Sequence, residues 1–119
     1  MDKKVAQHDI LWMATDDWTG LWEVAWSLQT LWPELRGEPA EQKGRALLSE
    51  LLDDGLIYLC FFGEGNKEKR VSRQKAHELL NDPENWEPPE GFIEHVRFAA
   101  TEEGERRMFA LEREVKAKS

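Results

Sequence analysis

The chain has 119 residues, of which 16 are Lys or Arg and 24 are Asp or Glu, so its formal net charge is −8. This length supports one domain with a single hydrophobic core, and we expect one domain over residues 1–119 with no separate substrate domain. The excess of acid repels phosphate backbones at long range, which counts against nucleic acid as a partner. No apolar run approaches the ~20 residues that cross a bilayer, no signal peptide is evident, and Cys60 is the lone cysteine, so we expect a cytoplasmic protein without a membrane partner.

The N-terminal third predicts two helices. Residues 8–14 contain the apolar run Ile10 to Met13, which is too short for its period to distinguish a helical turn from a strand, and we interpret it as a short first helix. Thr15, Asp16 and Asp17 offer capping oxygens and negative charge before the run 18–32, where a second helix is expected to begin. That helix has one narrow polar stripe and is otherwise apolar, which is typical of a helix that is mostly buried or meets a partner.

The middle of the chain encodes a helix, its end and a strand. Pro33 to Pro39 predicts a connecting loop, and the leucines that follow recur at helical spacing over about residues 40–54. Gly55 supplies the left-handed residue that ends such a helix, and residues 56–62 form a β-prone apolar run. A return strand is expected at about 94–100, and we place Leu48, Leu51, Ile57, Leu59 and Phe98 in the core beneath these strands.

A long insert separates the two strands. Over about 63–93 it contains a short helix at 72–80 with Ser72 as its cap, followed by a turn-rich stretch. We predict that this insert is ordered and that Trp86 packs back onto the domain. Thr101 then caps a final helix with one apolar stripe that is expected to face the core. Phe109 lies off this stripe and would be available to a second subunit.

Two short motifs carry a resemblance. Leu52 to Ile57 reads Leu-x-x-Gly-Leu-Ile, and Thr101 to Gly104 reads Thr-x-x-Gly. Together with the order of helices and strands, they resemble the winged helix-turn-helix module. The resemblance implies an α+β, winged-helix-like fold: three helices, a two-stranded antiparallel wing carrying a long helical insert, and a C-terminal helix. The insert at 63–93 departs from the family, in which the wing connection is usually a few residues.

Tryptophans dominate the N-terminal half. Trp18, Trp22 and Trp26 are spaced to stack along one side of the second helix. They suit a partner or dimer surface, because tryptophan supplies large contact area at small entropic cost. A tryptophan-rich core and a small-molecule pocket are the other interpretations.

Two further groups suit DNA or a partner protein. Gln42, Arg45 and Ser49 lie at i, i+3 and i+7 on the third helix, which would be the recognition helix of a DNA-binding protein. Acidic neighbours surround them, which also fits a solvated helix face. A basic cluster at the wing fits phosphate contact, docking of an acidic protein or a solvated loop; its members are Lys67, Lys69, Arg70, Arg73 and Lys75.

Catalytic and cofactor patterns are weak. His8, His77 and His95 fall on separate predicted elements without metal-ligand spacing, and Cys60 lies within an apolar strand. We therefore expect no enzyme activity, no metal and no cofactor.

The sequence thus favours an acidic protein-binding module, such as a regulatory adaptor or an inhibitor or immunity-type protein. Its candidate contact residues are Trp18, Trp22, Trp26, Lys67, Lys69, Arg70, Arg73 and Trp86. The alternative is a dimeric DNA-binding transcription regulator that uses Gln42, Arg45 and Ser49 at bases and Lys67, Lys69 and Arg70 at phosphates.

Overall fold

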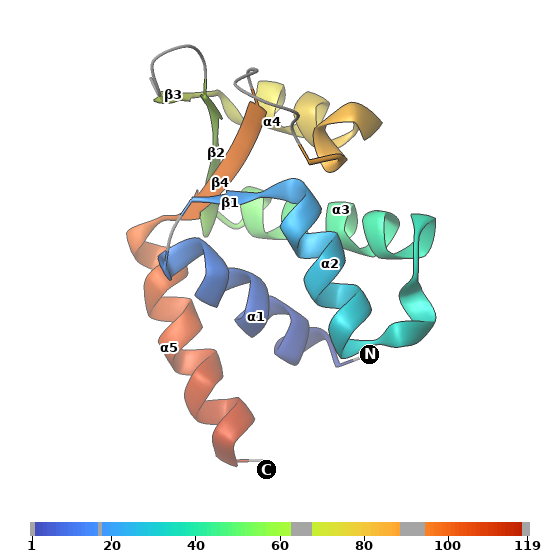
Figure 1. The fold of residues 1–119 in the computed structure, drawn as a ribbon. Coiled ribbons are helices and arrows are strands. Elements are labelled where there is room, and N and C mark those ends of the chain that lie inside the picture. The colour runs from blue at the N-terminus through green and yellow to red at the C-terminus, as the bar shows by residue number, and fades with distance from the viewer. Residues whose placement is uncertain (1, 17, 63–67, 89–94, 118–119) are drawn as a thin grey trace.

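The computed structural model describes residues 2–16, 18–62, 68–88 and 95–117, which form an α+β fold (Figure 1). Its helices are α1 (Lys3–Asp16), α2 (Leu21–Leu31), α3 (Glu38–Asp53), α4 (Arg73–Leu80) and α5 (Glu102–Ala117), with 3₁₀ turns η1 (Pro33–Leu35) and η3 (Pro83–Trp86). Its strands are β1 (Thr19–Gly20), β2 (Ile57–Phe62), β3 (Glu68–Arg70) and β4 (His95–Ala100). None of the helices in these ranges is long and apolar enough to cross a membrane.

The described strands form one antiparallel sheet in the order β1-β4-β2-β3. The long pair β2 and β4 matches the two predicted strands, with Leu59 opposite Phe98. The expected two-stranded wing is nevertheless wrong in extent, because β1 and β3 add a strand at each edge. Strands of two and three residues are too short to show a period in the sequence.

The second helix begins later than predicted. Helix α1 continues through Asp16, and residues 19–20 pair with β4 before α2 begins at Leu21. Gly20 is the N-cap of α2, with an extended backbone at φ −75° and ψ 153°. Its N–H donates to Oε2 of Glu23 at 2.7 Å, whereas the predicted cap residues Thr15 and Asp16 belong to α1 and Asp17 lies outside the described residues.

The two motifs of the resemblance meet in space. Gly55 has a φ of 73°, which confirms the predicted left-handed end of α3. The Thr101 hydroxyl donates to the Gly55 carbonyl at 2.7 Å and also accepts from the Gly104 N–H at 3.0 Å, which confirms Thr101 as the cap of α5. The turn after α3 and the start of α5 are thereby joined by one side chain.

Gly104 is required by that junction. A Cβ at Gly104 would lie 1.9 Å from the carbonyl oxygen of Leu56, a backbone atom that cannot rotate away. We expect Gly104→Ala to lower the free energy of unfolding by roughly 1–3 kcal/mol through overpacking. Urea denaturation measures the loss, and Glu105→Ala on the same turn should change stability by less than ~0.5 kcal/mol. Equal stability of the two variants would show that α5 does not approach Leu56 this closely.

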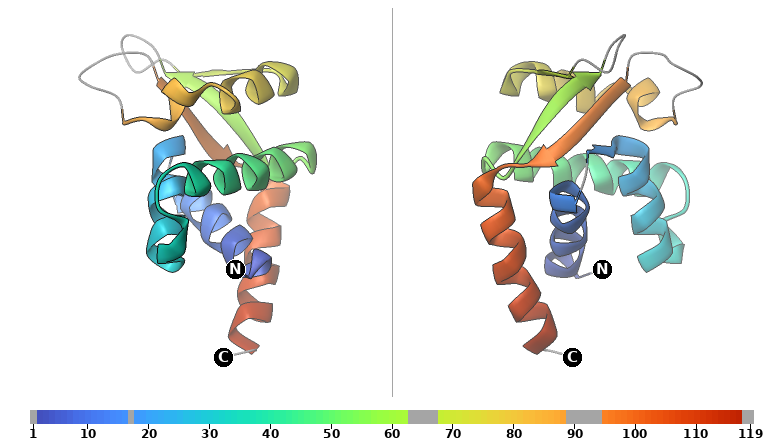
Figure 2. Two further views of the ribbon diagram at one scale, coloured as in Figure 1. Left: turned by 90° about the vertical axis from the view of Figure 1, so that its right-hand side faces the viewer. Right: turned by 60° about the vertical axis from the view of Figure 1, so that its left-hand side comes forward.

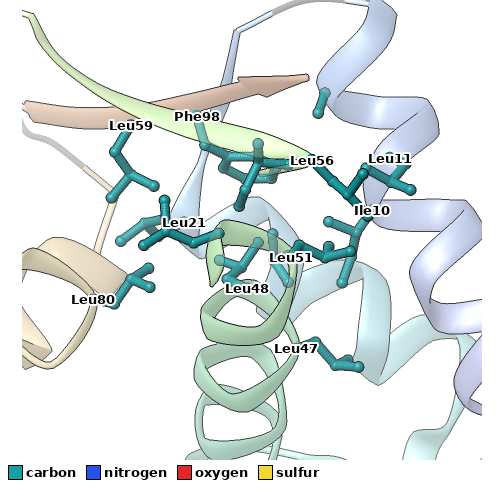
Figure 3. Close-up of a cluster of buried hydrophobic side chains, with 14 of the residues drawn as sticks. Ile10, Leu11, Leu21, Leu47, Leu48, Leu51, Leu56, Leu59, Leu80 and Phe98 are labelled. Atoms are coloured by element: carbon teal, nitrogen blue, oxygen red, sulfur yellow. The ribbon is translucent and has the colours of Figure 1, made fainter. Parts of the chain in front are cut away.

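The core lies between the inner face of the sheet and the helices (Figure 3). Leu48, Leu51, Ile57, Leu59 and Phe98 are each at most 2% exposed, as predicted. Helices α1 and α5 lie side by side below the sheet (Figures 1 and 2), and Lys4 Nζ pairs with Glu114 Oε2 at 3.0 Å between them. Phe109 is 49% exposed on α5, off the inward stripe, as the sequence indicated.

The structure describes residues 68–88 of the predicted insert, and these pack on the domain, while residues 63–67 and 89–93 lie outside the described residues. Ser72 caps α4 by accepting from the Lys75 N–H at 3.2 Å, as predicted. Trp86 is 3% exposed, and its indole N–H donates to the Leu80 carbonyl at 2.8 Å. The predicted anchoring of the insert by Trp86 is thus confirmed.

Candidate functional site

The outer face of the sheet carries a row of aromatic and basic side chains. Successive side chains of a strand point to opposite faces, so Leu59 and Phe98 face the helices while Tyr58, Cys60 and Arg97 face away from them. In Figure 1 the layer of helices lies on the inner side and no helix runs across this outer face. The face is therefore a candidate for contact with another molecule.

Trp22 forms one end of the row. The indole of Trp22 lies over Gly20 so closely that a Cβ there would meet the ring at 2.2 Å. Trp22 also meets the His95 ring edge to face, with centroids 6.3 Å apart. Arg97 Nε donates to His95 Nε2 at 2.8 Å, which joins the imidazole to the next side chain on the same face of β4.

Trp18, Tyr58 and Arg70 form the other end. Nη1 of Arg97 lies 3.5 Å from the Trp18 carbonyl oxygen, and the Trp18 and Tyr58 rings meet at 88° with centroids 5.6 Å apart. The Arg70 guanidinium carbon lies 4.3 Å from the centroid of the Tyr58 ring, a cation–π contact. We call the whole set the cation–aromatic row, and its members are Trp22, His95, Arg97, Trp18, Tyr58 and Arg70.

A hollow of about 760 Å³ opens beside this row. Trp18, Tyr58, Cys60 and Ala100 line it on the sheet side, and Arg70 stands at its margin. The first turn of α5 closes another side with Thr101, Glu102, Glu103 and Arg106, of which Arg106 is paired to Glu103. The hollow therefore combines an aromatic wall, a basic margin and an acidic margin.

The predicted tryptophan stripe is wrong. Trp18 precedes α2 and joins the sheet face, and Trp22 is only 9% exposed against that face. Trp26 is 55% exposed, beside a separate open hollow of about 610 Å³ with Gln29, Thr30, Pro33 and Arg36. The cause is the short strand β1, which moves the start of α2 past Trp18.

The basic cluster does not form one ridge. Lys67 lies outside the described residues. Lys69 and Arg70 are consecutive on β3 and so point to opposite faces, and Arg70 alone reaches the cation–aromatic row. Arg73 and Lys75 are exposed on α4, where Lys75 Nζ lies 3.5 Å from Glu78 Oε2.

The three candidate base-reading residues of α3 have different environments. Gln42 is exposed and donates to Glu38 at 3.3 Å. Arg45 lies with its guanidinium carbon 5.8 Å from the centroid of the Trp86 ring and its Nη2 3.5 Å from Glu41 Oε2. Ser49 Oγ lies 3.3 Å from His77 Nδ1, so the insert contacts two of the three.

Ser49, His77 and Asp53 form a hydrogen-bonded cluster that the sequence did not predict. His77 comes from α4, and its Nε2 lies 2.8 Å from Asp53 Oδ1. The spacing of Ser49 and Asp53, one helical turn apart, was the available signal, but nothing local brings His77 to them. The cluster joins α3 to α4, and its Asp53 side chain is 57% exposed.

Tyr58, His95 and Arg97 were also missed as site residues. In the sequence these residues alternate with the apolar residues of β2 and β4, and this alternation indicates that the sheet has a second, more polar face.

Within the described ranges, no three His, Cys, Asp or Glu side chains are grouped as a metal site would require.

Comparison of the chain with protein-family models, with curated proteins and with solved structures gave no significant match.

Proposed function

We propose that this chain is a non-enzymatic protein-binding module on a winged-helix-like scaffold, acting as a regulatory adaptor or an inhibitor. The order helix, short strand, two helices and a long antiparallel strand pair supports that scaffold, with α2 and α3 as the helix-turn-helix and β2 and β4 as the wing. The contacts that join Gly55, Thr101 and Gly104 support it further, since they unite the two motifs of the resemblance.

The observation that carries the function is the insert lying against α3. A recognition helix must present its outward side chains to base edges in the major groove. Here the Arg45 guanidinium carbon lies 5.8 Å from the Trp86 ring and its Nη2 3.5 Å from Glu41, and Ser49 bonds to His77, so both side chains have partners within the protein itself. The net charge of −8 adds long-range repulsion of DNA.

The runner-up is a dimeric DNA-binding regulator. It is favoured by the exposure of Lys69 and Arg70 at the wing and of Phe109, which is 49% exposed on α5 and could meet a second copy. Regulators of this kind pair two modules to match two half-sites, so a dimer is expected under this alternative.

Titration with random-sequence duplex DNA separates the two proposals. At physiological salt we expect affinity weaker than the ~10⁻⁴ to 10⁻⁶ M common for non-specific binders, because the acidic surface opposes phosphate contact. Fluorescence anisotropy of a labelled duplex measures it. Micromolar affinity, with a steep salt dependence that shrinks in Lys69→Ala and Arg70→Ala, would promote the regulator.

A further inference from the structure

Arg70 is the member of the cation–aromatic row that could bind an acidic ligand. The Arg70 guanidinium carbon lies 4.3 Å from the centroid of the Tyr58 ring, and a guanidinium held against an aromatic face still has N–H donors to offer a ligand. Arg45 and Arg106 each have a glutamate partner, whereas none of the ion pairs between the side chains that the structure describes involves Arg70. A preorganised fork of this kind suits a carboxylate or phosphate that accepts two hydrogen bonds.

The hollow beside Arg70 has room for an apolar group. Its wall includes the rings of Trp18 and Tyr58, and its volume of about 760 Å³ falls in the range of known ligand sites. An acidic group on Arg70 with an apolar group next to it would therefore meet both features at once.

The charges around the hollow distinguish an acidic peptide from a nucleic acid. Glu102 and Glu103 also line the hollow, from the start of α5, with Glu103 paired to Arg106, and the whole chain carries a net charge of −8. A nucleic-acid strand brings a phosphate with every nucleotide and would place several of them near these glutamates. A peptide can place one carboxylate on Arg70 and a neutral side chain toward α5.

We propose that the outer face of the sheet docks an acidic segment of a partner protein, with a carboxylate on Arg70 and an aromatic or branched apolar side chain in the hollow beside Trp18 and Tyr58. This inference rests on the proposed protein-binding function, and it names the surface and the chemistry of the partner.

Selection from a random dodecapeptide display library against the full-length chain tests the proposal. The selected peptides should be enriched in Asp or Glu next to an aromatic or branched apolar residue. A synthetic peptide of the selected sequence, labelled for anisotropy, should lose at least tenfold in affinity for Arg70→Gln. Arg113→Gln, which removes the same charge from an exposed position on α5, should leave the dissociation constant within twofold.

Circular dichroism and the thermal midpoint of Arg70→Gln show whether the variant keeps its fold, which is expected because Arg70 is exposed on an edge strand. The proposal is overturned if the library gives no enriched sequence, if the enriched sequences lack acid, or if Arg70→Gln binds them as well as the original chain does. Displacement of the peptide by micromolar oligothymidylate would also overturn it, in favour of single-stranded nucleic acid.

These outcomes are separate from failure of the proposed function. Peptides that bind regardless of Arg70 would move the docking surface elsewhere and leave a protein-binding module. Micromolar binding of duplex DNA would instead remove the function on which the inference rests.

Discussion

Leu51→Ala is expected to lower the free energy of unfolding by about 2–5 kcal/mol, a large share of the stability of a small domain. Leu51 is 1% exposed and lies within the core cluster that α3 shares with the sheet (Figure 3). Its backbone carbonyl also accepts from the Leu56 N–H at 2.9 Å, at the turn that leads into β2. Truncation leaves a cavity at the point where helix, turn and strand meet.

Urea denaturation followed by circular dichroism measures the change. Leu31→Ala is the matched control, because Leu31 ends α2 with 42% of its surface exposed and should lose less than ~1 kcal/mol. A Leu51→Ala midpoint within error of the original protein, or a loss no greater than that of Leu31→Ala, would show that this face of α3 is misplaced.

Strands β2 and β4 and the helix boundaries near them could be predicted because each has a local cause. Gly55 ends α3 through its positive φ, and Ser72 and Thr101 begin their helices through side-chain caps. These signals depend on one residue and its immediate neighbours. The same locality explains why the predicted core under the strands is correct.

The edges of the sheet could not be predicted in this way. Strand β1 consists of Thr19 and Gly20, and its pairing with Phe98 and Arg97 joins residues far apart in the chain. Without that pairing, the sequence after Asp16 predicts that α2 begins too early. Trp18 was therefore assigned to a stripe along the helix, although the Trp18 ring contacts Tyr58 on the sheet.

The environment of α3 also depends on tertiary contacts. The spacing of Gln42, Arg45 and Ser49 places them on one side of the helix. Only the fold of the insert brings Trp86 to Arg45 and His77 to Ser49. The row on the sheet face has the same origin, since its members come from α2, the segment before β1 and three strands. Sequence patterns identify which faces exist, whereas the topology decides which faces are covered.

Trp86→Ala is expected to cost about 3–5 kcal/mol, the range for truncating a large buried aromatic residue. The indole is 3% exposed, donates to the Leu80 carbonyl at 2.8 Å and lies so close to Gly44 that a Cβ there would approach the ring to 2.9 Å. Truncation removes this packing, leaves the Leu80 carbonyl without its indole donor and frees the Arg45 guanidinium from the ring above it. The loss should therefore include loosening of the insert as well as a lower global stability.

Two measurements separate these effects. Urea denaturation reports the global loss, and hydrogen exchange reports the local one, with amides of 73–80 expected to exchange faster in Trp86→Ala while those of β2 remain protected. Trp26→Ala is the matched control, because Trp26 is 55% exposed on α2 and its removal should change stability by less than ~1 kcal/mol. If the two tryptophan variants unfold at the same urea concentration and α4 exchanges equally in both, Trp86 does not hold the insert against α3. The covering of Arg45 and Ser49, on which the protein-binding proposal depends, would then lose its main support.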